Sequence, residues 1–431
     1  MKKTIARQLL MIVTAGAMLG ESAWALDCNS PRWVSAWQAS PADARWLGLS
    51  FDFFSLNLPM GPNQSYRQVF SPLGSGSTVR LKFSNRHSNS PLIIRSTNLA
   101  RQAVGAAIVA GTLTPVRFNN GQSAVTVPAG QDILSDPVNF SFRSLEKLSV
   151  SIATGNTRTD FVPTGHMVGM EHSYVTEPGA GDRTTDIEGG AFRYRTTRRH
   201  LLTGMDVLAP AHTAAVVTLG DSITDGYQSV IGANQRYPDF LKRRIDGAGL
   251  PYFVVNAGIA GNRVATDNPI QQFGVSAVNR LDADVLKASG VSDVILLEGI
   301  NDIGQDYFKF LDYWNRYSKI INAYQTLITS LQARGLKVMQ GTLTPSGSAL
   351  NPSYSGPFAR QLRQDVNWWI RNKSPADSII DFDAAVRNPS NHAVIDDRYD
   401  SGDGLHFNAE GYARLAAAVD LGKLQGSKCR G

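Results

Sequence analysis

Three residues of this chain have the types and spacing needed for nucleophilic acyl chemistry. Ser222 lies in Gly-Asp-Ser-Ile-Thr, residues 220–224, directly after the apolar run 214–219, and Asp403 and His406 lie in Asp-Gly-Leu-His near the C-terminus. A serine hydroxyl is a weak nucleophile until an imidazole takes its proton, and the imidazole needs a carboxylate that fixes its tautomer and offsets its developing charge. We therefore predict Ser222 as nucleophile, His406 as base and Asp403 as the acid that orients it.

Each motif has a plainer interpretation when taken alone. Gly-Asp-Ser and Asp-Gly are common turn sequences, and a single histidine is more often structural than catalytic. The remaining histidines lack comparable partners in the sequence, so we interpret them as structural: His87, His166, His172, His200, His212 and His392. His166 and His172 could together bind a metal, but no carboxylate pattern supports that alternative.

The C-terminal half has the pattern of an α/β domain that would bring these motifs together. Apolar, strand-like runs alternate with helical stretches after Ala211, which predicts five parallel strands in a doubly wound sheet. The runs are Ala214–Leu219, Phe253–Asn256, Val294–Leu297, Val338–Leu343 and Ser378–Phe382. A closing helix is predicted just after His406, with Asn408 as its N-cap.

Polar clusters follow the predicted strands where each one ends. Asp221 and Ser222 follow the first strand, residues 256–262 follow the second, and residues 298–302 follow the third. The carboxyl ends of parallel strands share one edge of a sheet, so groups far apart in sequence can meet there around one point. The Gly-x-Ser-x-Gly elbow of α/β-hydrolases and a phosphate-binding loop with lysine are both absent from the sequence.

The N-terminal half has a different period. Short alternating segments such as residues 78–83 and 148–152 lie between clusters of Gly, Pro, Asn and Ser, which is typical of half-buried strands. We predict an antiparallel β-sandwich domain over residues 26–210, followed by the hydrolase domain over residues 211–431. Because no segment resembles a disordered linker, we expect the two domains to pack closely.

The C-terminal motifs resemble the SGNH hydrolases, also called GDSL esterases, whose four sequence blocks carry Ser, Gly, Asn and His. The resemblance covers Val216 to about Leu424 and assigns the three roles above to Ser222, His406 and Asp403. It also implies an oxyanion hole formed by the backbone N–H groups of Ser222 and Gly261 and by the side-chain amide of Asn301. Gly258 is a second candidate for the glycine, and Asn301 could instead cap a helix or turn. Asp221 and Asp302 are expected to hold their loops by accepting backbone hydrogen bonds.

The whole chain is similar to a secreted branch of that family with an N-terminal β domain, related to acetylxylan esterases. The segments that carry this similarity are residues 33–41, 79–85, 220–226 and 297–304. The branch implies removal of acetyl or other short acyl groups from carbohydrate, with no cofactor and no metal. A lipase or general short-chain esterase is the alternative within the same chemistry, and Trp368 and Trp369 could line an apolar cleft for it.

An inert hydrolase domain on a carbohydrate-binding protein is the alternative of another class. Aromatic residues of the β domain could stack on sugars, although aromatics are more often buried in cores. They are Trp33, Trp37, Trp46, Phe51, Phe53 and Phe54.

The first 25 residues have the composition of a signal peptide. Lys2, Lys3 and Arg7 precede an uncharged apolar stretch, and Ala23-Trp24-Ala25 fits a cleavage site. The apolar stretch is shorter than the about 20 residues that span a bilayer, so we expect no stable membrane insertion of the mature protein. We predict export to the periplasm or the cell exterior.

The two cysteines, Cys28 and Cys429, are expected to form a disulfide in an oxidising compartment. Lipid modification of Cys28 is the alternative, which the acidic Asp27 disfavours. The formal charge of +6 would fall to +4 on loss of residues 1–25 with Glu21 and three basic residues. Short basic clusters in a mildly basic chain are usually solvated faces, so no nucleic-acid partner is expected.

Overall fold

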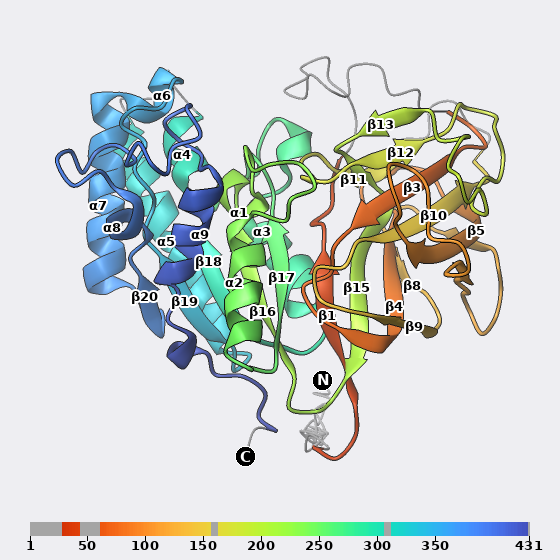
Figure 1. Cartoon of the computed structure of the whole chain (residues 1–431). Helices are drawn as coiled ribbons and strands as arrows, with labels where there is room; N and C mark the ends of the chain where they lie inside the picture. The colour runs from red at the N-terminus through yellow and green to blue at the C-terminus, as the bar shows by residue number, and fades with distance from the viewer. Residues whose placement is uncertain (1–27, 44–60, 157–162, 306–311, 430–431) are drawn as a thin grey trace, which may run out of the picture.

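The computed structural model describes residues 28–43, 61–156, 163–305 and 312–429. Antiparallel strands occupy its N-terminal part and parallel strands its C-terminal part, side by side (Figure 1). The predicted signal peptide lies outside the described residues, as do Trp46, Phe51, Phe53 and Phe54.

Three antiparallel sheets form the N-terminal region. The first has the order β1-β15-β4-β8, with β9 also paired to β4: β1 (Arg32–Gln38), β15 (Leu202–Ala209), β4 (Gly76–Ser84), β8 (Asp132–Leu134) and β9 (Val138–Phe142). The second has the order β13-β12-β3-β10-β5-β6, with β7 paired to β5: β13 (Tyr194–Thr196), β12 (Ser173–Val175), β3 (Ser65–Phe70), β10 (Leu148–Thr154), β5 (Leu92–Arg101), β6 (Thr114–Pro115) and β7 (Val125–Val127). The third is small: β14 (Arg199–His200), β11 (Thr164–His166) and β2 (Ala42–Asp43).

The two larger sheets contribute to one hydrophobic cluster. Val79 and Leu81 of β4 are buried in the same cluster as Val150 and Ile152 of β10. The alternating pattern therefore correctly predicted antiparallel strands, while their arrangement as a sandwich stays a prediction. Trp37 belongs to this cluster, which accords with a core role for that aromatic residue.

The C-terminal region contains the five predicted parallel strands. Their order is β17-β16-β18-β19-β20: β17 (Tyr252–Gly258), β16 (Ala214–Gly220), β18 (Val291–Leu297), β19 (Lys337–Gly341) and β20 (Ser378–Ile380). The last strand was predicted too long, because Asp381 caps α8 (Phe382–Val386) by accepting a hydrogen bond from the Ala384 N–H. Phe382 therefore begins a helix.

Alternate residues of the strands face helices on opposite sides of the sheet. Val216 and Val254 are clustered with apolar residues of α2 (Tyr237–Gly247) and α9 (Ala409–Ala418). Their neighbours Val217 and Val255 are clustered instead with residues of α5 (Tyr313–Gln332) and α7 (Pro357–Lys373). Helices thus cover both faces, as the doubly wound prediction requires. The shorter helices are α1 (Ser222–Asp225), α3 (Ala277–Leu281), α4 (Ile300–Gly304) and α6 (Pro352–Ser355).

The strand order places a functional crevice at one edge of this sheet. The chain passes from β16 to its neighbour β17 on one side and then to β18 on the other, so the connections leave β16 and β18 in opposite directions. Ligand sites of open α/β sheets form at the carboxyl ends of strands beside such a reversal. The loops after β16, β17 and β18 therefore surround one position.

The N-terminal region packs beside β17. The Val254 N–H of β17 donates a hydrogen bond to the Leu73 carbonyl oxygen over 3.0 Å, and the Ser35 N–H donates to Ser289 over 2.9 Å. Close packing of the two regions was therefore correctly predicted.

The ends of the described chain meet at the amino edge of the parallel sheet. Cys28 and Cys429 form the predicted disulfide. The carboxylate of Asp293, near the start of β18, accepts hydrogen bonds from the Gln425 and Gly426 N–H groups over 2.7 and 3.1 Å. Within the described part of the chain, none of the helices has the length and apolarity required to cross a membrane.

Candidate active site

Ser222 is held at a sharp strand-to-helix turn. It follows β16 as the first residue of α1, and the Asp221 carboxylate caps this helix by accepting a hydrogen bond from the Ile223 N–H over 2.9 Å. Gly220 permits the close approach, because a Cβ there would lie 2.1 Å from the Thr224 hydroxyl and 2.3 Å from the Leu297 carbonyl oxygen. The turn therefore fixes the serine against the ends of two strands.

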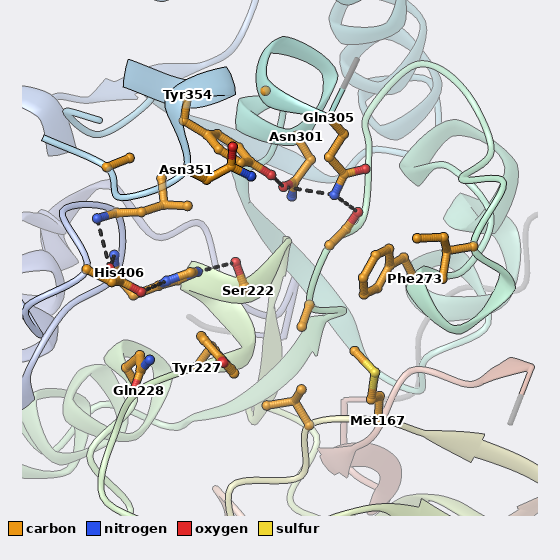
Figure 2. A pocket seen from close by; sticks show the side chains of 18 of the residues that line it. Met167, Ser222, Tyr227, Gln228, Phe273, Asn301, Gln305, Asn351, Tyr354 and His406 are labelled. Carbon is orange, nitrogen blue, oxygen red and sulfur yellow. Dashed lines mark hydrogen bonds and ion pairs between the residues drawn. The ribbon is translucent and has the colours of Figure 1, made fainter. Parts of the chain in front are cut away.

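The structure brings Ser222, His406 and Asp403 into one hydrogen-bonded chain, and Figure 2 shows its link between Ser222 and His406. The distance is 2.8 Å from Ser222 Oγ to His406 Nε2, and 2.6 Å from His406 Nδ1 to Asp403 Oδ2. His406 lies on the loop before α9, whose predicted N-cap is confirmed, since Asn408 accepts from the Gly411 N–H. The arrangement has the geometry needed for proton transfer from the serine hydroxyl to the imidazole.

Asp403 is itself oriented by the backbone. Its Oδ1 atom accepts hydrogen bonds from the Leu405 and His406 N–H groups over 2.9 and 2.8 Å. Burial acts to raise the pKa of Asp403, but the His406 side chain and the backbone donors outweigh it and hold the pKa well below its ordinary value. Asp403 is therefore ionised at neutral pH, and its free oxygen faces the imidazole.

Two backbone donors face the cavity beside Ser222. Among the described residues, none accepts a hydrogen bond from the N–H of Ser222 or of Gly261. Gly261 has φ of +78°, and a Cβ there would lie 2.5 Å from the Phe273 ring. Gly258, the alternative glycine, already donates its N–H to Asn256 Oδ1 over 2.9 Å and does not line the cavity.

The Asn301 amide is fixed in one orientation by its partners. Asn301 Nδ2 donates to the Asn262 carbonyl oxygen over 2.8 Å, while Oδ1 accepts from Gln305 Nε2 over 3.2 Å and lies 2.7 Å from the Tyr354 hydroxyl. An amide nitrogen carries two hydrogens, so one remains available toward the cavity. Asn301 therefore presents a preset donor, whereas Gln305 and Tyr354 carried no recognisable signal in the sequence.

These groups line one cavity of about 1030 Å³. His406 lies on one side of Ser222, and Phe273 and Met167 lie on the other (Figure 2). The N-terminal region contributes part of the wall, a feature that the sequence did not reveal: Met167, Val168, Met170 and Thr197.

A buried network of charges lies behind the site. The Arg280 guanidinium donates hydrogen bonds to Gly220 O over 2.9 Å and to Ala257 O over 2.6 Å, and so connects the ends of β16 and β17. It also contacts the carboxylates of Asp284 and Glu298. No sequence motif indicated Arg280, because its partners are backbone carbonyl oxygens and side chains that only the fold brings together.

Three buried carboxyl groups behind the site, those of Glu298, Asp221 and Asp302, have pKa values raised toward their neutral forms. Burial raises the pKa of Glu298 above its ordinary value and that of Asp221 to about 7. Burial also raises the pKa of Asp302 to about 6, although Asp302 accepts hydrogen bonds from the Val264 and Ala265 N–H groups over 2.7 and 3.0 Å. Both aspartates thus hold backbone N–H groups, as expected.

One expectation about the other histidines is wrong. His166 is buried and contacts the Asp225 carboxylate over 3.0 Å, so it has a carboxylate partner, as His406 does. Asp225 is distant in sequence and part of no motif with His166, which is why the pairing could not be predicted. In the part of the chain that the structure describes, no group of three or more His, Cys, Asp or Glu residues is placed to hold a metal ion.

The two adjacent tryptophans do not line the cavity. Trp369 is buried and Trp368 is 55% exposed, as expected for neighbours on a helix. They give no support to a lipid-binding cleft.

Comparison with known proteins gives a family match for the C-terminal region. Residues 218–414 match the model of the GDSL-like lipase/acylhydrolase family. A comparison with curated protein sequences yields no significant match.

Solved structures similar to this region include several esterases. A carbohydrate acetylesterase from Sinorhizobium meliloti is 19% identical over 48% of this chain and 96% of its own, with a TM-score of 0.33. An acetyl xylan esterase from Geobacillus stearothermophilus is 20% identical over 48% and 94%, with a TM-score of 0.36. An aryl esterase from M. smegmatis is 17% identical over 48% and 96%, with a TM-score of 0.34.

Proposed function

We propose that residues 218–414, which match the GDSL-like lipase/acylhydrolase family, make this protein a serine carboxylic-ester hydrolase that works through an acyl-enzyme. The observation that carries the proposal is the chain from Ser222 through His406 to Asp403, which opens into a cavity with three preset donors. The base lies at hydrogen-bonding distance from both the nucleophile and the orienting acid, and the three donors line the same cavity.

In the first half of the reaction Ser222 Oγ attacks the ester carbonyl while His406 Nε2 takes its proton. The carbonyl oxygen becomes an oxyanion that receives hydrogen bonds from the N–H groups of Ser222 and Gly261 and from Asn301 Nδ2. Donors fixed in advance stabilise this charge more than water does, because they need not reorient. His406 then donates its proton to the departing alcohol, which leaves the acyl group on Ser222.

In the second half a water molecule takes the place of the alcohol. His406 removes its proton, the same donors stabilise the second oxyanion, and the acid is released as the proton returns to Ser222. Asp403 receives the Nδ1–H of His406 throughout, so the neutral imidazole accepts at Nε2 and the imidazolium formed in each half is stabilised by the carboxylate.

The two sides of the cavity favour different parts of the ester. The leaving oxygen must lie next to His406, so the alcohol occupies the side where the amide side chains of Gln228 and Asn351 lie (Figure 2). The acyl group then extends past Ser222 toward Phe273 and Met167, which are apolar. Amides beside the alcohol favour a hydroxyl-rich one, so we propose acetyl or other short acyl esters of carbohydrates as substrates.

We further propose the domain organisation and location that the sequence suggested. Residues 1–25 are a signal peptide, residues 26–210 a β-sandwich domain and residues 211–431 the hydrolase domain. The disulfide between Cys28 and Cys429 supports an oxidising compartment, the periplasm or the cell exterior.

The test is hydrolysis of p-nitrophenyl esters from acetate to palmitate by the purified mature protein. We expect acetate and other short esters to be turned over, Ser222→Ala to abolish turnover without loss of the folded state, and EDTA to have no effect. Ser229→Ala is the matched control, because Ser229 lines the same cavity and its buried hydroxyl has no hydrogen-bond partner among the described residues.

Acetylated xylan and long-chain lipid esters then separate the two ester classes. Preference for long chains would replace the proposal with a lipase. Equal inactivity of the native protein and Ser222→Ala on every ester would contradict the proposal and favour a carbohydrate-binding protein.

A further inference from the structure

His166 is a buried histidine whose two ring nitrogens both face hydrogen-bond acceptors. It ends β11 in the N-terminal region and is 6% exposed. Nδ1 lies 3.0 Å from the Ser40 carbonyl oxygen, and Nε2 lies 3.0 Å from both the Val168 carbonyl oxygen and Asp225 Oδ1. A carbonyl oxygen can only accept, so each nitrogen must carry a hydrogen. The geometry points to an imidazolium.

The electrostatics of the site agree with that protonation state. Burial by itself would lower the pKa of His166, but the charge and hydrogen bond of Asp225 outweigh it and raise the pKa above its ordinary value. Two guanidinium groups near Asp225 are held by other partners. Arg236 pairs with Asp239 over 2.9 Å, and Arg199 donates to the carbonyl oxygens of Val69 and Gly169. Within the described part of the chain, His166 is thus the cation that contacts Asp225 directly.

Asp225 connects this imidazolium to the loop that carries an oxyanion donor. It is the last residue of α1, three positions after Ser222. Its Oδ1 faces His166, while its Oδ2 accepts a hydrogen bond from the Ala260 N–H over 3.0 Å. Ala260 directly precedes Gly261.

The Gly261 N–H is therefore held from both sides. Asp225 fixes the peptide group that precedes Ala260, and the Gly261 carbonyl oxygen accepts hydrogen bonds from Asn268 Nδ2 and Gln305 Nε2, each over 3.0 Å. Between these two clamps lies the peptide whose N–H faces the cavity. If Asp225 moved, only one clamp would remain.

We propose that His166 is a positioning residue through which the N-terminal β region sets the oxyanion hole of the hydrolase domain. The His166 imidazolium holds Asp225, and Asp225 holds the Ala260–Gly261 backbone at the angle at which the Gly261 N–H meets the oxyanion. This inference rests on the ester hydrolysis proposed above. It gives the β region a part in transition-state stabilisation as well as in forming the cavity wall.

His166→Gln and Asp225→Asn test the proposal, with His200→Gln as the matched control. Glutamine has a single NH₂ group, so it cannot replace the two ring N–H groups that face the two carbonyl oxygens and Asp225. Asparagine has one side-chain oxygen in place of two, so it cannot accept from both His166 and Ala260 as the carboxylate does. His200 is also a buried histidine, on the strand paired with β11, but it does not contact Asp225. His166 and His200 lie on paired strands of the same small sheet, and Asp225 contacts His166, so all three substitutions affect one region of the molecule.

Three readouts separate positioning from simple destabilisation. We expect kcat on short p-nitrophenyl esters to fall about tenfold in His166→Gln and Asp225→Asn, with KM within about twofold. The inhibition constant of a trifluoromethyl ketone, whose adduct carries an oxyanion, should rise by the same factor as kcat falls. Hydrogen exchange of the peptide that contains Ala260 should become faster in both variants.

His200→Gln should lower thermal stability and leave all three readouts unchanged. The proposal is overturned if kcat, the inhibition constant and the exchange rate stay at native values in His166→Gln and Asp225→Asn, or if His200→Gln changes them equally. Hydrogen exchange needs no turnover, so a native protein that hydrolyses no ester would contradict the proposed function while the exchange data still tested the clamp on Ala260.

Discussion

The oxyanion role proposed for Asn301 leads to a prediction in which the effects on catalysis and on stability separate. Asn301→Ala removes the cavity-facing donor together with the contacts to Asn262, Gln305 and Tyr354. Asn301→Asp keeps an oxygen where Gln305 and Tyr354 need one. A carboxyl group carries at most one hydrogen, so it cannot donate both to Asn262 and to the oxyanion.

The size of each effect follows from these contacts. Loss of one preset oxyanion donor costs about 3 kcal/mol of transition-state stabilisation, which corresponds to about a hundredfold fall in kcat. Because Ser222 and Gly261 still donate, we expect residual activity in both variants. Asn301→Ala also removes one hydrogen-bond partner each from the buried Tyr354 hydroxyl and the Asn262 carbonyl oxygen, at about 1–3 kcal/mol of folding free energy each, whereas Asn301→Asp retains the Tyr354 contact.

The assay is steady-state hydrolysis of p-nitrophenyl acetate with thermal unfolding of the same preparations. Both variants should lose about a hundredfold in kcat with KM within about twofold, while Asn301→Ala unfolds at a lower temperature than Asn301→Asp. Tyr354→Phe is the control, because it removes one partner of the amide and leaves the donor, so kcat should fall less than fivefold. Native kcat in Asn301→Asp, or a loss of kcat that follows stability across the variants, would refute the oxyanion assignment.

Four further predictions follow: two concern Asp403, one the chain ends and one the acyl side. In Asp403→Asn the amide oxygen stays with the two backbone donors, so the amide NH₂ group faces His406 Nδ1. This forces the histidine tautomer that cannot accept a proton at Nε2, so kcat should fall about a thousandfold. The pKa of Asp403 lies below its ordinary 3.8 in the folded protein, so ionised Asp403 stabilises the fold above that pH and this stabilisation is lost as pH falls. Acid unfolding, monitored by circular dichroism, should therefore depend less on pH in Asp403→Asn. Equal unfolding profiles would contradict a lowered pKa of Asp403 in the folded protein. Cys28→Ser, which leaves Cys429 unpaired, should lower the free energy of unfolding by about 2–4 kcal/mol. Initial rates of ester hydrolysis at 25 °C should stay unchanged, because the disulfide lies at the opposite edge of the sheet from the cavity. A fall in the initial rate would contradict that separation. Met167→Trp should slow p-nitrophenyl ester hydrolysis more as the acyl chain lengthens and spare acetate, and uniform slowing would remove Met167 from the acyl side.

Local patterns were sufficient to predict the residues that occupy sequence motifs. Ser222, Asp403 and His406 each follow a recognisable segment, and the alternation of apolar runs predicted five parallel strands whose ends meet. The pattern of apolar runs could not predict where the last strand ends. Phe382 continues an apolar run, but it follows Asp381, which caps a helix, and so it begins that helix.

The supporting residues could not be found in this way. Arg280 and His166 act on backbone carbonyl oxygens and carboxylates that reach them only through the folded topology. Any residue supplies a carbonyl oxygen, so no residue type marks such a partner in the sequence. The wall formed by Met167 depends likewise on how two regions pack, which periodicity within either region does not encode.

The bond between Cys28 and Cys429 joins positions 401 residues apart, so nearly the whole described chain forms a covalent ring. A single cut by a protease at any peptide bond between these cysteines opens the ring and releases no fragment. The two pieces stay tethered, and β1 and β15, which pair although they come from opposite ends of the N-terminal region, need not separate. If export is as proposed, one nick by a protease would relax the backbone at a loop while the walls of the cavity stay tethered to one another.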